Sequence, residues 1–273
     1  MKGLVLKKNA NLFTIECNDK IFTLHPSGKT KMGGVFVGDF VEFENSITKV
    51  YPRKNLFIRP PLANLKKLFI VISPIPKPDF VLVDKMLIYC ALNDVEPLIV
   101  INKKEIADDE FIENVKEDYK FYNILLTSAK ENDVEQIIDS IEGICAFAGQ
   151  SAVGKSSIIN SIFSENIALI GDLSKKIERG KQTTRIVELF KINNGYIADT
   201  AGFSMLDLNM VSSLEKRELS SYYPDFLTGR QLCKYRSCLH QNGECGVIQL
   251  VSEGKISQRR YQNYLKILSE LKD

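Results

Sequence analysis

A glycine-rich segment near the middle of the chain constrains the fold more than any other feature. Residues 149–156 read GQSAVGKS and fit G-x-x-x-x-G-K-[ST], the phosphate-binding P-loop. An apolar run at 144–148 precedes the segment, and residues 157–163 follow it with helical character. Backbone N–H groups of such a loop curl around phosphate oxygens, and the start of the helix adds the positive end of its dipole. The pattern predicts a strand, a phosphate-binding loop and a helix in this order.

About half of the chain precedes this loop, although a P-loop opens the domain of an ordinary GTPase. Two segments upstream of the loop match other motifs of a GTPase domain. An apolar run at 97–101 ends in N-K-K-E at 102–105, which resembles the guanine-recognition motif N-K-x-D with Glu in place of Asp. A second run at 123–127 ends in S-A-K at 128–130, like the loop that closes over the guanine base. The run at 97–101 is expected to be a buried parallel strand, and the second motif is also expected to follow a strand.

The remaining motifs of a GTPase follow the P-loop. A short run at 195–198 leads into D-T-A-G at 199–202, a D-x-x-G motif whose Asp belongs to the Mg²⁺ shell and whose Gly N–H contacts the γ-phosphate. Residues 179–185 read RGKQTTR and suit a switch segment whose threonine completes the metal site. The usual order of the motifs is therefore rotated, and the sequence predicts a circularly permuted GTPase domain.

The chemistry of phosphoryl transfer suggests a role for each motif residue. Ser156, Asp199 and Thr184 are expected to surround Mg²⁺, with Thr183 as the alternative to Thr184. The candidate catalytic residues are Lys155, Gln182 and Thr184, since Lys155 neutralises charge on the phosphates and the Gln182 amide can hydrogen-bond a water. The predicted nucleotide-binding residues are Asn102, Lys103, Glu105, Ser128, Ala129, Lys130, Gly149, Gln150, Ser151, Ala152, Val153, Gly154, Lys155, Ser156, Ser157, Asp199 and Gly202.

Charge is distributed unevenly along the 273 residues, which have room for two or three domains. Residues 1–64 contain ten Lys and Arg against five Asp and Glu, and residues 211–273 contain ten against seven, so the segment between them is acidic. Basic flanks around an acidic core suit a protein that contacts nucleic acid. No apolar run approaches the ~18 residues that span a membrane, and the first residues lack the apolar core of a signal peptide. We therefore expect a cytoplasmic protein with no membrane partner.

The N-terminal flank has the pattern of a small β-barrel. Short segments of strand character occur within residues 10–24, 33–43 and 47–50, and turn residues separate them. Several short strands with turns every 8–12 residues fit an OB-fold, which frequently binds nucleic acid; a barrel with a purely structural role is the alternative. Residues 51–64 include two adjacent prolines and predict an extended connector.

The C-terminal flank carries a compact set of metal ligands. Cys233, Cys238, His240 and Cys245 place three thiols and an imidazole within thirteen residues. Half of the six cysteines and one of the two histidines of the chain lie in this cluster. Thiolates and neutral imidazole suit tetrahedral Zn²⁺, and four protein ligands leave no open position for a substrate. We therefore predict one structural zinc ion.

Residues 257–272 predict a terminal helix. Tyr261, Tyr264 and other apolar residues recur on one side of it, and we expect Arg259, Arg260 and Lys266 to point outward. The sequence thus predicts a multi-domain protein with an N-terminal OB-fold at 1–64, an α/β circularly permuted P-loop GTPase at 65–220 and an α-helical zinc-binding domain at 221–273.

Taken together, these features resemble the RsgA/YjeQ family of circularly permuted GTPases. The resemblance rests on the motif order, on R-P-P-L-A-N at 59–64, on D-T-A-G-F-S at 199–204 and on the cysteine cluster, and it covers essentially the whole chain. It implies GTP hydrolysis with Mg²⁺, one zinc ion, a role in maturation of the small ribosomal subunit, and ribosomal RNA contacts from both flanks. The family commonly has Asp in place of Glu105 and a histidine in place of Gln182.

Two other functions are compatible with the same motifs. An adenine-nucleotide enzyme would share only the P-loop, and competition between GTP and ATP would identify it. A nucleotide-switched RNA-binding module would hydrolyse GTP incidentally, and a comparison of hydrolysis-dead with binding-dead variants would identify it. The function that we predict is that of a monomeric GTPase whose partners are the small ribosomal subunit with its rRNA and GTP or GDP.

Overall fold

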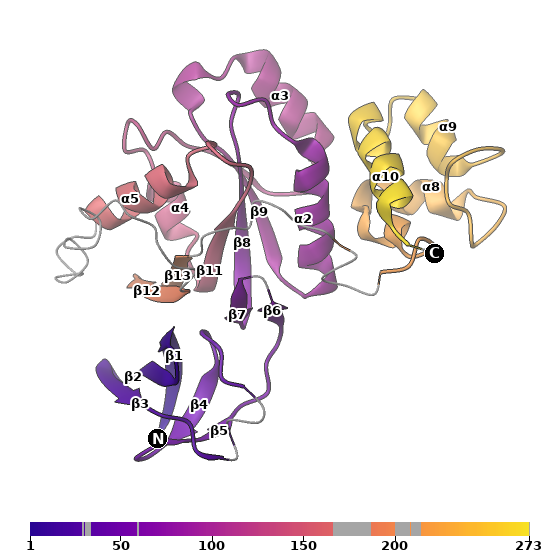
Figure 1. The fold of residues 1–273 in the computed structure, drawn as a ribbon. Helices are drawn as coiled ribbons and strands as arrows, with labels where there is room; N and C mark the ends of the chain where they lie inside the picture. Colours follow the sequence, from indigo (N-terminus) through magenta and orange to yellow (C-terminus); the bar gives the residue numbers. More distant parts are fainter. Residues whose placement is uncertain are drawn as a thin grey trace.

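The computed structural model describes residues 1–28, 30, 34–58, 60–165, 187–199, 208 and 214–272, without the side chains of Glu165 and Asp199. Three groups of elements follow one another along the chain (Figure 1). Short strands form the N-terminal group, a sheet with helices on its faces forms the central group, and short helices form the C-terminal group beside it.

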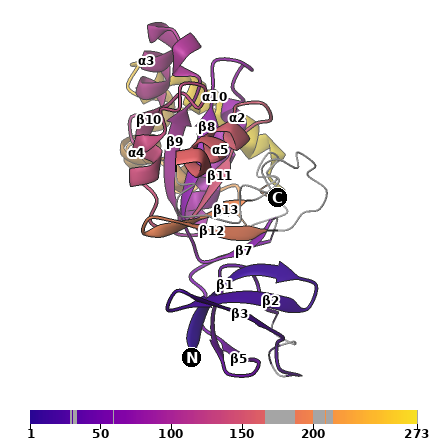
Figure 2. The same ribbon diagram turned by 90° about the vertical axis from the view of Figure 1, so that its left-hand side faces the viewer.

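The N-terminal group is a small barrel that lies below the central group in Figure 2. Its strands are β1 (Lys2–Asn9), β2 (Leu12–Cys17), β3 (Lys20–Leu24), β4 (Phe40–Phe43) and β5 (Ile47–Val50). Strand β1 pairs antiparallel with both β2 and β4, and a parallel bridge between Pro26 and Ile47 joins the segment after β3 to β5. Inward residues such as Val5, Phe13 and Phe43 form its own core. The predicted OB-type barrel is confirmed.

The segment predicted as an extended connector contains a hairpin instead. Its strands are β6 (Leu56–Ile58) and β7 (Pro61–Ala63), which pair antiparallel. Pro61 is tolerated because it stands at the first residue of its strand, where no ladder N–H is needed. The Ala63 N–H donates to the Val37 carbonyl at 2.9 Å, and the Asn64 amide donates to the Gly38 carbonyl at 2.9 Å. These hydrogen bonds attach the hairpin to the barrel.

The central group is built on a mostly parallel sheet. Its strands are β8 (Leu65–Ile72), β9 (Glu96–Ile101), β10 (Ile124–Leu126), β11 (Gly143–Ala148), β12 (Glu188–Ile192) and β13 (Gly195–Asp199). They lie in the order β10-β9-β8-β11-β13-β12, and every pair is parallel except β12 with β13. The central strands are apolar runs because helices cover both faces of the sheet.

Alternate residues of β8 show how those helices are divided between the faces. Leu68 and Ile70 belong to the core beneath α2 (Phe80–Leu92) and α3 (Asp109–Asp118), whereas Phe69 and Val71 belong to the core beneath α4 (Glu135–Asp139) and α5 (Lys155–Glu165). The side chains of a strand alternate between the two faces of its sheet, so this split follows from the strand geometry. Because β8, β9, β10, β11 and β13 are parallel, their carboxyl ends meet at the same edge of the sheet.

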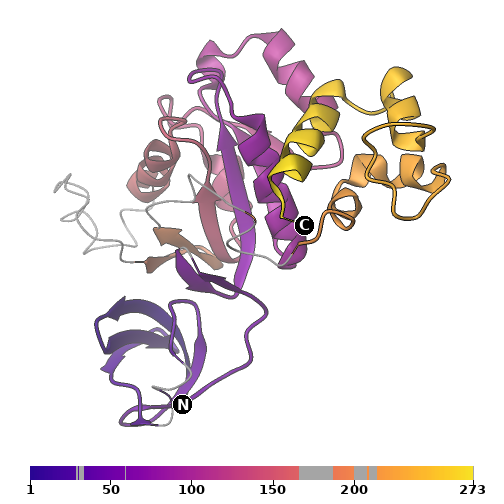
Figure 3. The same ribbon diagram turned by 45° about the vertical axis from the view of Figure 1, so that its right-hand side comes forward.

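The C-terminal group packs against α2, as Figure 3 shows. Its elements are η3 (Leu219–Tyr222), η4 (Pro224–Phe226), α8 (Leu227–Gln231), α9 (Gly246–Ser252) and α10 (Gln258–Glu270). The contact between α10 and α2 joins the two groups, and residues of both helices share one hydrophobic core.

The expectation that Arg260 points outward is wrong, whereas the Arg259 side chain is 39% exposed. Arg260 is 1% exposed; its guanidinium pairs with Asp84 of α2 and lies 3.0 Å from an Asp225 carboxylate oxygen. Arg259 forms an ion pair with Asp118. The helical pattern of 257–272 could not reveal this, because the carboxylates that make burial of Arg260 tolerable come from distant parts of the chain.

Candidate nucleotide site and metal centre

The P-loop segment lies between β11 and α5, at the edge of the sheet where the parallel strands end. Gly149 and Gly154 have φ angles of 139° and 98°, which L side chains rarely adopt. A Cβ on Gly149 would stand 2.3 Å from the Val71 carbonyl oxygen, and one on Gly154 would stand 2.2 Å from the Asn102 side-chain nitrogen. The backbone therefore approaches its neighbours as closely as glycine permits, in the strand–loop–helix arrangement that the motif predicts.

Lys155 begins helix α5 and reaches back over the loop. Its Nζ donates to the carbonyls of Gly149 and Gln150, each at 2.7 Å. Burial lowers the pKa of Lys155. The ammonium thus sits at the mouth of the loop, where phosphate oxygens can replace the two carbonyls, while Ser156 and Ser157 present exposed side chains from the first turn of the helix.

The segment 102–105 is bound directly to the P-loop. Asn102 is buried, and its side-chain NH₂ donates to the Val153 carbonyl at 2.8 Å. The ammonium of Lys103 donates to the carbonyls of Ala152, at 2.9 Å, and Ile75, at 2.6 Å. Two motifs about fifty residues apart in sequence therefore share hydrogen bonds at one edge of the sheet.

The segment 128–130 joins the same cluster. The Ala129 N–H donates to the Asn102 side-chain oxygen at 3.2 Å, and the Ser161 hydroxyl of α5 donates to the Ala129 carbonyl at 3.0 Å. Ser128 is fully buried, whereas Lys130 is exposed. Asn102 thus contacts both the P-loop and this segment, so one side chain connects the three loops.

Glu105 lies in the short helix η1 (Lys104–Ile106) and has an unused acceptor. Within the described part of the chain, its buried Oε2 has no hydrogen-bond partner. Burial by itself would raise the pKa of Glu105, but hydrogen bonds from Ser128 and from its own backbone, with the charges of Lys130 and Lys103, lower it. The carboxylate is therefore ionised at neutral pH and can accept hydrogen bonds from a ligand.

Several predicted site residues lie outside the described residues. These are Gln182, Thr183, Thr184 and Gly202. Asp199 is the last residue of β13, and its backbone pairs with Glu188 of β12. Of the predicted Mg²⁺ ligands, Ser156 is the one whose side chain is described, at the start of α5.

The predicted zinc ligands converge in the C-terminal group. The Sγ atoms of Cys233 and Cys245 lie 3.7 Å apart, and the Nδ1 atom of His240 lies 3.5 Å and 3.3 Å from them. With Cys238, the four ligand atoms all lie within 4.8 Å of one another. Two sulfur atoms bound to one zinc at ~2.3 Å and at the tetrahedral angle would be about 3.8 Å apart. The donor set and spacing fit one tetrahedral Zn²⁺ ion.

Helix α10 holds the loop that carries this cluster. The hydroxyls of Tyr261 and Tyr264 donate to the carbonyls of His240, at 2.8 Å, and Leu239, at 2.9 Å. Burial, with the charge of Arg230, lowers the pKa of His240 to about 4, so its imidazole is neutral, as a metal ligand must be. The helical pattern placed the two tyrosines on the apolar side of the helix but did not predict these hydrogen bonds. A buried tyrosine hydroxyl usually has a hydrogen-bond partner, and this was the signal for them.

Other contacts of the site were not evident from the sequence. The Gln150 side-chain oxygen accepts from the backbone N–H of Asp79 at 3.0 Å, and Asp79 caps the N-terminus of α2. The P-loop is thereby bonded to the helix on which the C-terminal group packs.

Among the described helices, none is long and apolar enough to cross a bilayer.

Comparisons with known proteins agree with this architecture. The model of the RsgA GTPase family matches residues 50–209. A small ribosomal subunit biogenesis GTPase RsgA from Mycoplasmopsis pulmonis (strain UAB CTIP) is 38% identical over 285 residues, covering 100% of both chains. One of the same name from Geobacillus sp. (strain WCH70) is 36% identical over 290 residues, covering 100% of this chain and 98% of the relative.

Solved structures show the same likeness in three dimensions. YjeQ from Thermotoga maritima superposes with a TM-score of 0.82 at 31% identity, covering 99% of this chain and 98% of the other. YloQ, described as a circularly permuted GTPase, superposes with a TM-score of 0.81 at 29% identity, covering 98% and 94%. The order of motifs, the sheet topology and these likenesses agree, and the chain belongs to the RsgA GTPase family.

Proposed function

We propose that this GTPase acts in the late maturation of the small ribosomal subunit and hydrolyses GTP to GDP and phosphate while bound to that particle. The relatives that it resembles over their full length are named small ribosomal subunit biogenesis GTPases. The observation that best supports a nucleotide site here is the pair of hydrogen bonds that the Asn102 side chain makes, one to the P-loop and one to the 128–130 segment. A ligand with a base and phosphates would touch both loops at once.

The proposed binding mode follows the contacts at this edge. The phosphates would lie along 149–156, with Lys155 exchanging its two carbonyl partners for phosphate oxygens. The guanine would lie between the ionised Glu105 and the 128–130 segment, with its N–H donors bound to the free carboxylate oxygen. Gly202 would add an N–H to the γ-phosphate.

Hydrolysis would depend mainly on positioning and charge. Mg²⁺ would bind Ser156, Asp199 and Thr184, and it would neutralise charge that develops on the phosphates. Lys155 and the backbone N–H groups of the loop would do the same from the other side. Gln182 would orient the attacking water by hydrogen bonding, since a glutamine amide is not a base near neutral pH.

Zinc would stabilise the C-terminal group rather than take part in hydrolysis. Cys233, Cys238, His240 and Cys245 would occupy all four tetrahedral positions, so no position remains for substrate. We assign residues 1–64 to an RNA-binding OB-fold, 65–220 to the GTPase and 221–273 to the zinc-binding domain. The proposed protein is a cytoplasmic monomer that contacts ribosomal RNA through both flanks.

The test is GTP turnover by the full-length protein with and without purified small ribosomal subunits. We expect stimulation on the order of 100-fold, which corresponds to about 2.7 kcal/mol of transition-state stabilisation. The stimulation should weaken as salt rises, because contacts to RNA phosphates release counterions. Turnover that small subunits leave unchanged at low salt would refute the proposal.

Competition binding separates this function from an adenine-nucleotide enzyme. Excess GTP should displace a fluorescent guanine nucleotide, whereas excess ATP should not. Comparison of a Gln182→Ala variant with a Lys155→Ala variant separates it from an RNA-binding module with incidental hydrolysis. If Gln182→Ala abolishes turnover but matures subunits as well as the wild type, hydrolysis is incidental.

A further inference from the structure

A group of aromatic and basic side chains lies on the outer side of strands β1, β4 and β5. Its members are Lys2 on β1, Phe40 on β4, and Lys49 and Tyr51 at the end of β5, and we call it the basic aromatic face. In the strand register Lys2 lies opposite Glu42 and Glu42 lies opposite Lys49, while the Tyr51 N–H donates to the Phe40 carbonyl at 2.9 Å. The alternate residues of β4, Val41 and Phe43, instead fill the barrel core.

Of the two rings on this face, Phe40 is exposed and Tyr51 is half-buried. Phe40 is 41% exposed although it is apolar, and the barrel core does not include it. Lys2 Nζ lies 4.9 Å from the ring centroid of Tyr51 and 5.3 Å from that of Phe40. Lys49 Nζ lies 5.3 Å from the ring centroid of Tyr51. Exposed ammonium–ring contacts are weak, so a ligand can displace them at little cost.

The charge of this face is positive and largely unpaired. In the part of the chain that the structure describes, the ammonium groups of Lys2 and Lys49 have neither a hydrogen bond nor an ion pair. Glu42 lies opposite both lysines in the register, and its negative charge offsets one of their two positive charges. The face therefore favours an anionic ligand, and the exposed carboxylate of Glu42 opposes it.

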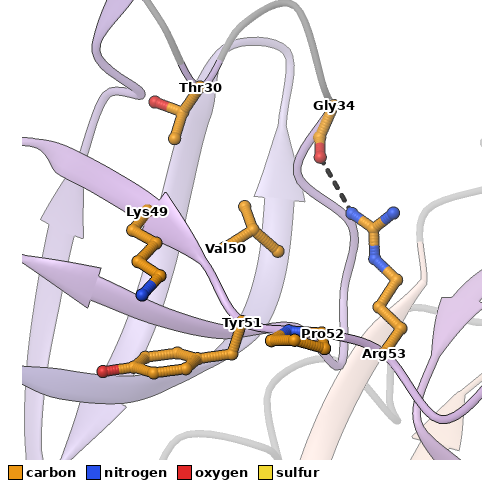
Figure 4. Close-up of a pocket in the computed structure, with 7 residues that line it drawn as sticks. All are labelled: Thr30, Gly34, Lys49, Val50, Tyr51, Pro52 and Arg53. Atoms are coloured by element: carbon orange, nitrogen blue, oxygen red, sulfur yellow. Dashed lines mark hydrogen bonds between the residues drawn. The ribbon is translucent and has the colours of Figure 1, made fainter.

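A pocket opens beside Tyr51 (Figure 4). It has a volume of about 580 Å³, within the range of sites that hold small organic groups. Arg53 forms one wall, and its guanidinium is held by the buried Asp39 carboxylate at 2.6 Å and 2.8 Å and by the Gly34 carbonyl at 2.9 Å. Its other lining residues are Thr30, Gly34, Lys49, Val50, Tyr51 and Pro52.

We propose that the basic aromatic face binds unpaired nucleotides of single-stranded RNA. A base would stack on Tyr51 or Phe40, the lysine ammonium groups would move from the rings to the flanking phosphates, and a neighbouring nucleotide would enter the pocket. Aromatic rings accept any base, whereas a duplex keeps its bases stacked internally. An acidic peptide could use the lysines but would leave the rings and the pocket unused. This inference rests on the proposed ribosomal RNA partner.

The assignment differs from the surface that OB-folds commonly use. That surface is centred on strands 2 and 3 of the barrel, where this chain carries Ile21, an exposed apolar residue of β3. The basic aromatic face instead lies on β1, β4 and β5. Variants on the two faces can therefore separate the two modes of binding.

The experiment measures fluorescence anisotropy of a labelled single-stranded RNA of about ten nucleotides with full-length protein at low salt. We expect the double variant Phe40→Ala/Tyr51→Ala to lose at least about 10-fold in affinity, because two stacking surfaces are removed. Lys2→Gln/Lys49→Gln should lose affinity and reduce its salt dependence. Glu42→Gln should bind more tightly than wild type.

Matched controls are Ile21→Ala on β3 and Phe121→Ala, which removes an exposed ring from the central group. Both should bind the RNA like wild type, and all variants should retain GTP binding as evidence of folding. A loss of affinity in Ile21→Ala with unchanged binding by Phe40→Ala/Tyr51→Ala would overturn the assignment. Equal competition by duplex RNA would also overturn it, since phosphate contacts alone would then explain binding.

Turnover with small subunits separates this inference from the proposed function. If small subunits stimulate the wild type and Phe40→Ala/Tyr51→Ala keeps full RNA affinity, the assignment of RNA binding to this face is wrong and the proposed function stands. If small subunits do not stimulate the wild type, the function fails, and the RNA affinities still decide the role of the face.

Discussion

The ammonium group of Lys7 in the barrel lies 3.0 Å from the carboxylate of Glu188 in the central sheet, and the two residues are also paired in strand register. Glu188 is in turn the register partner of Asp199, the first residue of the D-x-x-G motif. A second polar contact joins the same parts, since the Tyr196 hydroxyl donates to Glu16 at 2.9 Å. The barrel is therefore attached to the β12–β13 hairpin, which lies between the two predicted switch segments in sequence.

This attachment predicts that Lys7→Met separates basal from stimulated turnover. The ion pair is partly buried, with 28% and 22% of the two side chains exposed, so its loss should loosen the barrel without unfolding it. We expect basal GTP turnover to stay within about twofold and stimulation by small subunits to fall about 3- to 10-fold, an effect of about 0.7–1.4 kcal/mol. Lys116→Met, in an exposed pair with Glu113, is the control and should change neither rate.

Lys155→Ala should severely weaken nucleotide binding. Its ammonium contacts two loop carbonyls that phosphate oxygens can replace, so the fold does not depend on it. We expect a loss of at least ~100-fold in affinity for a fluorescent GTP analogue, about 2.7 kcal/mol. Circular dichroism should match the wild type. Near-normal affinity would mean that this loop does not hold the phosphates.

Glu105→Ala should lose the preference for guanine over adenine nucleotides, and Glu105→Asp should largely keep it. A pocket that pairs polar edges discriminates strongly, because an unpaired buried group is costly. The pKa of Glu105 lies below its ordinary value of 4.5. The carboxylate is therefore charged at any pH above 4.5 and gains a proton only at lower pH. The preference should therefore be constant through neutral pH. An unchanged preference in Glu105→Ala, measured by competition, would remove 102–105 from the base site.

Cys238→Ser should lower the zinc content to well below one per chain and loosen residues 222–273. Structural zinc contributes folding free energy directly, so the C-terminal group should become sensitive to proteolysis while GTP binding persists. Cys17→Ser changes a thiol outside the cluster and should keep one zinc. Metal analysis with one zinc per chain in Cys238→Ser would contradict the four-ligand assignment.

Arg260→Leu should destabilise the protein far more than Arg259→Ala. Removing the guanidinium leaves the Asp84 carboxylate buried without its cation, at a cost of about 3–5 kcal/mol, whereas the ion pair of Arg259 is partly exposed and its loss should cost at most ~1 kcal/mol. Chemical denaturation of the two variants measures the difference. Equal stabilities would show that the buried network contributes little.

The sequence by itself determined the parts of the molecule that depend on short segments. The P-loop at 149–156, the apolar strand at 97–101 and the order of the motifs were all readable from local patterns. The cysteine cluster was equally readable, because its ligands lie within thirteen residues. In each case the signal comes from residues that lie close together in the sequence.

The tertiary structure alone decided the contacts between distant segments. Helical periodicity placed Arg260 outside, but Asp84 and Asp225 make its burial possible. The pairing of Lys7 with Glu188 joins residues 181 positions apart. Such partners leave no periodic signal in either segment, because a charged side chain looks the same in sequence whether it meets solvent or a carboxylate from another element.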